Sequence, residues 1–200
     1  MEDNKVFLRK QSMLEYVMKI KSYVIQDFAR YCLDRVPDYF WTTAASSTGK
    51  YHPKFALGDG GLFRHTRAAL YYANEMLKLE MFHPLDEYSD LIYFSLIFHD
   101  CQKLGKDSKF TLHQHPLLAV QFIKDHAKEY EQLHQGFKNY EQQMNLIYDL
   151  IASHMGQWNT NDYVNIVLPK PKTQLEKFVH LCDYLASRKG DKECLDYQQQ

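Results

Sequence analysis

The most constraining feature of the sequence is the segment 87–99 (EYSDLIYFSLIFH), which is nearly all apolar in its second half. A helix that is apolar around most of its circumference is buried on most faces, because no side of it can meet water without cost. We therefore expect a core helix here, covered by other parts of the chain. The pair His99-Asp100 stands at its end.

The rest of the chain supplies the covering helices that such a core needs. Apolar residues recur at helical spacing, and no segment shows the alternation expected of a convincing strand. The pattern predicts an all-α bundle of six or seven helices, the others lying at 12–35, at 62–80, from His115 onward, at 141–153 and from 173 to about 188. A chain of 200 residues suits one compact domain, with residues 1–41 packed on the core.

Local signals indicate where these helices begin and end. Thr173 with Glu176 matches the capping box, in which two side chains satisfy free N–H groups of a first turn. Ser12 with Glu15 has the same spacing. Residues that start or stop the remaining helices are Pro37, His83-Pro84, Pro116 and Gly156.

Two polar segments interrupt the helical pattern. Residues 42–61 (TTAASSTGKYHPKFALGDGG) are small, polar and glycine-rich, and residues 157–172 are polar and contain two prolines. Loops as long as the first are usually functional or disordered in a compact domain. We expect an ordered loop there, but SSTGK lacks the spacing of a phosphate-binding P-loop, so it predicts no ATP site.

Charge and composition exclude several classes of protein. Lysine plus arginine (24) nearly balances aspartate plus glutamate (25), whereas an extended nucleic-acid surface is normally strongly basic. No uninterrupted apolar stretch is long enough for a membrane span. The four cysteines form no CxxC pair and the first residues carry no signal-peptide pattern, so we expect a cytoplasmic protein. The sequence does not determine the oligomeric state.

Ten histidines in 200 residues are an excess that points to metal binding or acid–base chemistry. Asp100 follows the apolar helix, where a carboxylate is costly unless a cation or hydrogen bonds compensate it. His65 lies near the start of one predicted helix, His115 opens another and His154 ends a third. Asp183 lies within the last helix. Because a helical bundle can bring such side chains to one interior point, they predict a metal centre.

The order H…HD…H…H…D resembles that of the HD-domain metal phosphohydrolase superfamily. GGLFRHT resembles its first-histidine motif, HDCQK resembles HDxxK with Lys103 at the lysine position, and HPLLAVQFI resembles the segment around a further histidine. SHMG followed by LPKPKTQLEKFVHLCDYLASRK resembles the closing portion of the 3′–5′ exoribonuclease branch. The resemblance covers residues 50–190 and implies an HD-domain helical fold.

The resemblance also implies a set of metal ligands. The first histidine, the HD pair and the last aspartate of the family hold one divalent ion, and here these are His65, His99, Asp100 and Asp183. Members with two further histidines hold a second ion, which implies His115 and His154, with Asp100 as the bridge.

Two departures from the family pattern accompany this ligand set. Met155 stands where the cited branch often has a second adjacent histidine, and Cys101-Gln102 replace the familiar Ile-Gly. The first change bears on the second ion and the second leaves the first ion intact. Nitrogen and oxygen ligands without thiolate suit Mn²⁺, Fe²⁺, Ni²⁺, Co²⁺ or Zn²⁺, and Mg²⁺ is a further candidate.

This chemistry predicts a hydrolase. A divalent ion lowers the pKa of a bound water toward neutrality, and the resulting hydroxide can attack phosphorus. We expect cleavage of a phosphodiester or phosphomonoester in a nucleotide or short oligonucleotide, with Asp100 and Lys103 as the catalytic residues. Lys103 would neutralise phosphate or pair with a ligand carboxylate. Two alternatives stay open: a non-catalytic nucleotide-binding module, and a di-iron oxygenase on a similar helical scaffold.

Four more residues are candidates for binding the substrate, namely Lys50, His52, Arg188 and Lys189. The first two lie in the glycine-rich loop, and the last two follow Asp183 by just over one turn, where they could instead be the cationic end of a helix. His113 competes with His115, but the following proline favours His115. We expect surface, turn or packing positions for His83, His126, His134 and His180.

Overall fold

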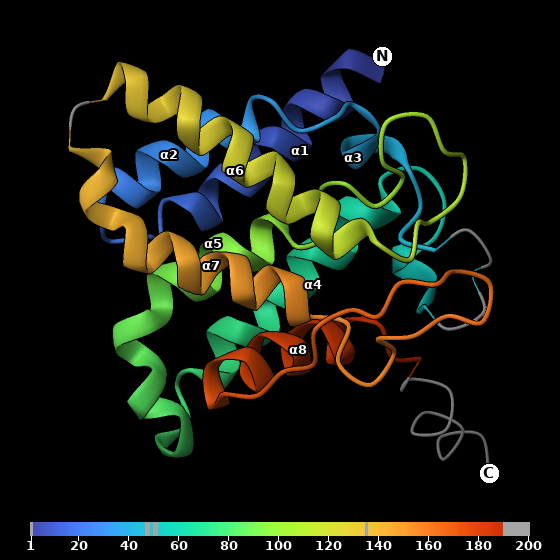
Figure 1. Ribbon diagram of the computed structural model, residues 1–200. Helices are drawn as coiled ribbons and strands as arrows, with labels where there is room; N and C mark the ends of the chain where they lie inside the picture. Colours follow the sequence, from blue (N-terminus) through green and yellow to red (C-terminus); the bar gives the residue numbers. More distant parts are fainter. Residues whose placement is uncertain (1, 47–48, 50–51, 135, 190–200) are drawn as a thin grey trace, which may run out of the picture.

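The computed structural model describes residues 2–46, 49, 52–134 and 136–189, and within these ranges the fold is all-α, as predicted (Figure 1). The α-helices are α1 (Glu2–Val17), α2 (Tyr23–Leu33), α3 (Tyr39–Thr42), α4 (Gly61–Met76), α5 (Ser89–Phe98), α6 (His115–Leu133), α7 (Glu141–Ser153) and α8 (Gln174–Ala186). Short 3-10 helices lie at Lys54–Ala56, Glu80–Tyr88 and Phe137–Tyr140. None of the helices in the described ranges has the length and apolar character needed to cross a membrane.

The apolar segment forms α5, which lies at the centre of the bundle as predicted. It packs against α1, α2, α4, α7 and α8 (Figure 1), and its side chains from Leu91 to Phe98 are all buried. Phe94 stacks on Phe28 of α2 with ring centroids 5.6 Å apart. Each large apolar side chain contributes about 1.5–3 kcal/mol when fully buried. This packing fixes the C-terminal end of α5, where His99 lies.

The N-terminal region forms two helices, so the prediction of one helix over 12–35 is wrong. α1 ends and α2 begins within that range, with Ser22 as the N-cap of α2. Ser12 lies inside α1 and not at its start. The capping-box spacing of Ser12 with Glu15 therefore does not mark a helix N-terminus.

A contact with α5 holds the turn between α1 and α2. The two carboxylate oxygens of Asp90 accept hydrogen bonds from the backbone N–H groups of Lys21 and Ser22, each at 2.8 Å. Ile20 in the same turn is buried. Apolar residues thus continue through the turn, and a partner distant in sequence fixes it, so helical periodicity alone could not reveal the break.

The helices α6, α7 and α8 begin where the sequence predicts. α6 starts at His115 with Pro116 in its first turn, and α7 spans 141–153. The capping box of α8 is present, because Thr173 accepts from the N–H of Glu176 and the Glu176 carboxylate accepts from the N–H of Thr173. Pro116 and the capping box therefore mark the starts of α6 and α8.

Two helices are shorter than predicted. α4 ends at Met76 instead of continuing to residue 80, and a 3-10 segment at Glu80–Tyr88 follows it and contains His83-Pro84. α8 ends at Ala186, just before Arg188. The proline ring cannot donate a backbone hydrogen bond, which is compatible with a short irregular helix but not with the interior of a long one.

The described part of the loop at 42–61 lies against the start of α4. The guanidinium of Arg64 donates to backbone carbonyls of this loop at 2.8 Å. Gly61 is the first residue of α4, and a Cβ there would collide with the backbone carbonyl of Ala56. The close approach therefore requires glycine, and it brings the loop next to the helix turn that carries His65.

Candidate metal centre

Side chains from five helices meet at one place inside the bundle. His65 lies near the start of α4, His99 and Asp100 end α5, His115 begins α6, His154 follows α7 and Asp183 lies within α8. The first five are at most 1% exposed, and the Asp183 side chain is 17% exposed. Every residue that the sequence predicts as a ligand therefore reaches the same cluster.

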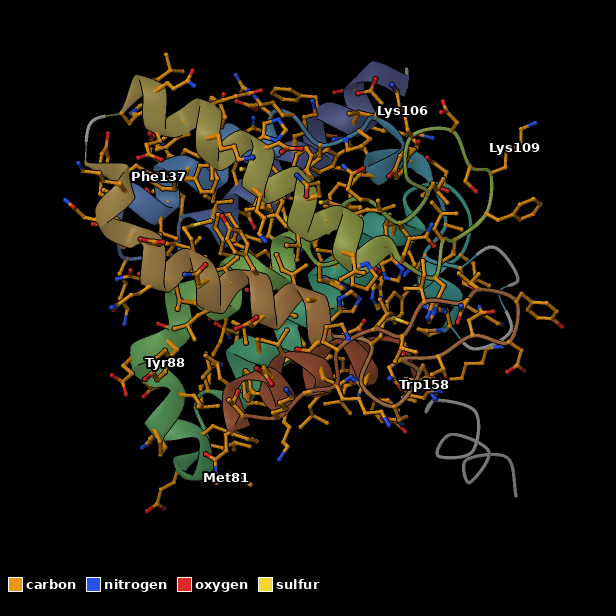
Figure 2. The ribbon with its side chains drawn as sticks, viewed as in Figure 1. Met81, Tyr88, Lys106, Lys109, Phe137 and Trp158 are labelled. Atoms are coloured by element: carbon orange, nitrogen blue, oxygen red, sulfur yellow. The ribbon has the colours of Figure 1, made fainter. Side chains whose placement is uncertain are left out.

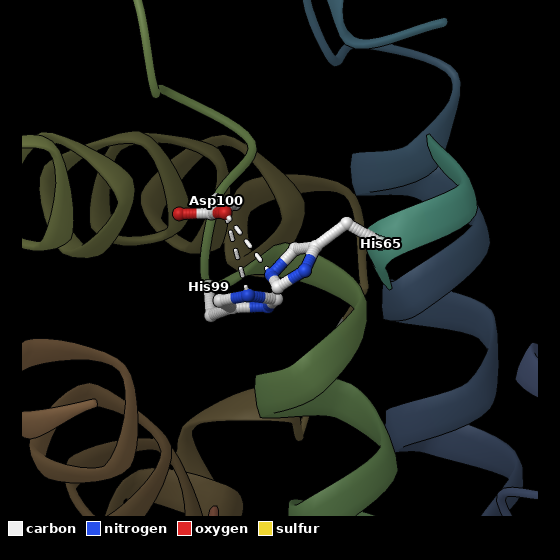
Figure 3. Close-up of side chains that lie close together, drawn as sticks. All are labelled: His65, His99 and Asp100. Atoms are coloured by element: carbon white, nitrogen blue, oxygen red, sulfur yellow. Dashed lines mark ion pairs between the residues drawn. The ribbon is translucent and has the colours of Figure 1, made fainter. Parts of the chain in front are cut away.

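The first half of the cluster is formed by two histidines and two aspartates. Nε2 of His65 lies 2.9 Å from Oδ1 of Asp183 and 3.6 Å from Oδ2 of Asp100. Nε2 of His99 lies 3.5 Å from each of the same two oxygens. Figure 3 shows the imidazoles of His65 and His99 directed at the Asp100 carboxylate. Potential ligand atoms of His65, His99 and Asp100 lie within 4.8 Å of one another, a spacing that one ion could serve.

The second half is formed by His115, His154 and the other oxygen of Asp100. Nε2 of His115 lies 2.9 Å from Oδ1 of Asp100, and Nε2 of His154 lies 3.7 Å from it. The two Nε2 atoms lie 3.2 Å apart. Asp100 thus presents one carboxylate oxygen to each half, which is the arrangement required of a bridging ligand.

Backbone hydrogen bonds orient three of the histidines. Nδ1 of His99, of His115 and of His154 each lies 2.7 Å from the carbonyl oxygen of the residue three positions earlier. A carbonyl only accepts, so each Nδ1 carries a proton and each Nε2 is the ring nitrogen that faces the cluster. This is the orientation that metal-binding histidines normally have in proteins.

Electrostatics keep the carboxylates of the cluster ionised. Burial would raise the pKa of Asp100, but the ammonium of Lys103 and the neighbouring His99 hold it well below its usual range. Burial acts on Asp183 in the same way, and the neighbouring His65, which hydrogen-bonds to it, and His99 lower its pKa instead. For His115, burial lowers the pKa to about 4. At physiological pH the cluster therefore combines two ionised carboxylates with the neutral imidazole of His115.

The cluster contains buried polar atoms that fit a cation. Nε2 of His99 and Nδ1 of His65 have no hydrogen-bond partner among the described residues. Leaving a buried polar atom unpaired costs about 1–3 kcal/mol. Because Nε2 of His99 lies 3.5 Å from an oxygen of each of two carboxylates, a divalent cation placed there could bind all three groups. The nitrogen and oxygen donors suit such an ion.

Lys103 forms an ion pair with the Asp100 carboxylate, which is one of the two roles that the sequence predicts for this lysine. Its ammonium lies 2.5 Å from Oδ2 of Asp100, and the residue is 8% exposed. The turn after α5 places it there, three residues beyond Asp100. A buried lysine of this kind is stable because a carboxylate compensates its charge.

Four of the six cluster residues, Asp100, His115, His154 and Asp183, line a cavity of about 410 Å³, which is within the range of small-molecule sites. His52 and Arg188, two of the four predicted substrate-binding residues, also line this cavity. Lys189 is exposed and is not among the lining residues, and Lys50 lies outside the described residues. Met155, the departure from the family pattern, lines it as well, and further lining residues that the sequence did not single out are Ala45, Ser46, Thr111, Trp158 and Ser187.

His52 lies beside the candidate metal ligands. Its ring centroid is 5.3 Å from that of His65, and burial together with the nearby Lys103 lowers its pKa to about 3. It is therefore a neutral imidazole at the edge of the centre. The remaining histidines lie elsewhere: His113 hydrogen-bonds the carbonyl of Ile166 at 3.1 Å, and ring contacts with neighbouring aromatic residues are made by His126, His134 and His180.

Comparison with known proteins adds one finding. Residues 62–188 match the family model described as the HD domain, which covers well over half of the chain and includes all six residues of the cluster. Neither the search of curated proteins nor the search of solved structures found a match.

Proposed function

The chain belongs to the HD-domain family, and on this basis we propose that it is a metal-dependent phosphohydrolase acting on nucleotides or short oligonucleotides. Proteins of this family are typically metal-dependent phosphohydrolases. The observation that carries the proposal is the position of Asp100, with one carboxylate oxygen 2.9 Å from His115 and the other 3.5 Å from His99. A carboxylate shared in this way suits two adjacent divalent ions.

In this proposal, the two halves of the cluster have separate tasks. His65, His99 and Asp183 hold one ion together with Asp100, and His115 and His154 hold a second. Ions bound there would polarise a phosphoryl oxygen and lower the pKa of the attacking water. Manganese, iron, nickel, cobalt, zinc and magnesium remain the candidates, since all accept nitrogen and oxygen donors.

The protein side chains supply orientation and charge. Carbonyl oxygens three residues earlier fix the rings of three histidines. Lys103 lines the cavity and already pairs with Asp100, so its ammonium can also contact a phosphoryl oxygen and offset the charge that develops there. This cation beside the bridging carboxylate favours a phosphate ester over the substrate of an oxygenase.

The size of the cavity and the net charge favour a small substrate. A volume of about 410 Å³ suits a molecule the size of a nucleotide, and a net charge of −1 does not favour an extended nucleic-acid surface. The similarity of the closing motifs to the exoribonuclease branch supports the terminal nucleotide of a short oligonucleotide as one form of this substrate.

The test is release of phosphate or nucleotide from cyclic nucleotides, dinucleotides, mononucleotides and short RNA with Mn²⁺ supplied. We expect the wild type to cleave one class, and Asp100→Ala to lower kcat by about three orders of magnitude, because activation of water by metal supplies much of the rate. Asp107→Ala is the matched control, since Asp107 is exposed on the same turn segment. Equal cleavage by Asp100→Ala would exclude the assigned site, and metal binding without cleavage would favour a binding module or an oxygenase.

A further inference from the structure

We propose that the indole of Trp158 stacks against the base of a nucleotide whose phosphate lies at the candidate metal centre. The inference rests on the proposed function and deepens it, because it names the residue that binds the aromatic base of the substrate. Among the described residues of the cavity, Lys103 and ions held by the histidines and aspartates could recognise a phosphate, but they do not select for a base.

Trp158 is exposed at the same cavity as the metal ligands. It lines the cavity together with Asp100 and Asp183, and it is 41% exposed. Figure 2 shows it on the loop between α7 and α8. The chain has two tryptophans, and the other, Trp41, is fully buried. An exposed indole beside a polar cavity is suited to a ligand that has one aromatic part and one charged part.

Contacts to two ligand-bearing segments hold the indole in place. Trp158 stacks on Tyr184, which directly follows Asp183, with ring centroids 5.7 Å apart and planes 13° apart. The ring of His180 lies 6.0 Å from the indole, and Nδ1 of His180 donates to the carbonyl of His154 at 2.7 Å. The position of the indole is therefore tied to both His154 and Asp183, as a binding surface requires.

Arg188 adds a positive charge beside this aromatic surface. Its guanidinium lies 5.3 Å from the ring centroid of Trp158 and 4.5 Å from that of Tyr184. Ser187 accepts hydrogen bonds from Nε and Nη2 of the guanidinium. A guanidinium has five N–H donors, so further donors are available for a phosphate oxygen or a base carbonyl at the cavity.

Stacking of a base on an aromatic side chain changes affinity by roughly 5- to 150-fold. The stacking should also quench the fluorescence of Trp158, while buried Trp41 contributes a constant background. The probes are adenosine 5′-monophosphate, its 3′ isomer and, as the ligand without a base, ribose 5-phosphate. Rapid mixing with the metal-loaded full chain measures binding before turnover.

Three variants give the comparison. Trp158→Ala should weaken binding of at least one adenosine phosphate by about tenfold or more, with ribose 5-phosphate changed by less than about twofold. Trp158→Phe retains a ring, so binding followed by calorimetry should stay within severalfold while the quench disappears. Tyr163→Ala is the control, because Tyr163 is 95% exposed on the same loop and does not line the cavity.

The outcomes separate this inference from the proposed function. If Trp158→Ala binds both adenosine phosphates as tightly as the wild type, or if no adenosine phosphate quenches at millimolar concentration, the stacking surface is wrong. An equal loss of affinity for ribose 5-phosphate would also overturn it, because the damage would then be general. A quench without hydrolysis of any ester would keep the base site and reject the hydrolase, whereas hydrolysis unaffected by Trp158→Ala would do the reverse.

Discussion

Asp100 is buried between four histidines, and its two oxygens have different neighbours. Oδ2 lies near His65 and His99 and pairs with Lys103, whereas Oδ1 faces the other two histidines. A buried carboxylate with this many cationic or polar neighbours stays ionised. The proposed chemistry depends most on this residue, because its ionised carboxylate faces both halves of the cluster.

Lys103 should act on phosphate and not on metal binding. Lys103→Ala leaves all six candidate ligands in place, so metal content should stay while turnover or substrate affinity falls about ten- to a hundredfold, on the order of 1.4–2.7 kcal/mol. Lys106→Ala is the control, since Lys106 is exposed near the same turn (Figure 2). Loss of metal together with activity would instead assign Lys103 a structural role in holding Asp100.

The sequence predicts the residues of the cluster but not all of its surroundings. Motif order and helix-end positions indicate the histidines and aspartates, because these residue types are costly in an apolar helical context unless they bind something. Trp158 follows His154 by four residues, yet an aromatic residue in a polar loop has no periodicity that would place it. Its contacts with Tyr184 and His180 of α8 show where it lies.

At the scale of the elements, three of the candidate metal ligands lie at the ends of helices. His99 and His154 are the C-caps of α5 and α7, and the C-terminal end of a helix carries partial negative charge that favours a nearby cation. His115 lies at the start of α6, after a loop that returns the chain to the cluster. Three histidines thus reach the centre from helix termini, where a side chain can extend beyond the packed core.

The turn after α7 is expected to require glycine at position 156. The φ of Gly156 is +60°, and a Cβ there would collide with the ring of His180. Gly58 has a similar φ of +66°, but a Cβ there would meet nothing within 4 Å. Gly58→Ala should cost about 1 kcal/mol of unfolding free energy from backbone strain alone, and Gly156→Ala about 1–3 kcal/mol more. Chemical denaturation measures both, and equal losses would contradict the contact.

The break between α1 and α2 can be tested with two serines. Ser22→Ala removes the N-cap of α2 and should lower the free energy of unfolding by about 1 kcal/mol. Ser12→Ala should be neutral or slightly stabilising, because alanine is the better helix former inside α1. Urea denaturation of both variants gives the comparison, and the opposite order of stabilities would support the single helix that the sequence pattern suggests.

Capping rules and apolar periodicity thus predict the elements unevenly. The starts of α6 and α8 follow from Pro116 and from the Thr173–Glu176 box, because those signals act within one turn. The start of α2 depends on Asp90, which is 68 residues away from Ser22 in sequence. A long-range partner of this kind leaves no trace in local periodicity.

At the scale of the molecule, the candidate centre joins helices α4 to α8. Each of these helices or its end provides at least one of the six residues, and the central α5 packs against three of the others that do. The apolar core therefore fixes the geometry of the polar centre. The fold class followed from helical periodicity along the chain, whereas the exact ligand set required the family resemblance and its geometry required the structure.

Metal content tests the central claim most directly. Untagged protein is reconstituted with Mn²⁺, dialysed and analysed for metal, together with the variant carrying both His115→Ala and His154→Ala, and with Asp107→Ala as control. The account predicts about two equivalents in the wild type and the control, and about one in the double variant, because that variant retains only the first ligand set. Less than about a tenth of an equivalent in the wild type would contradict a metal centre of this kind.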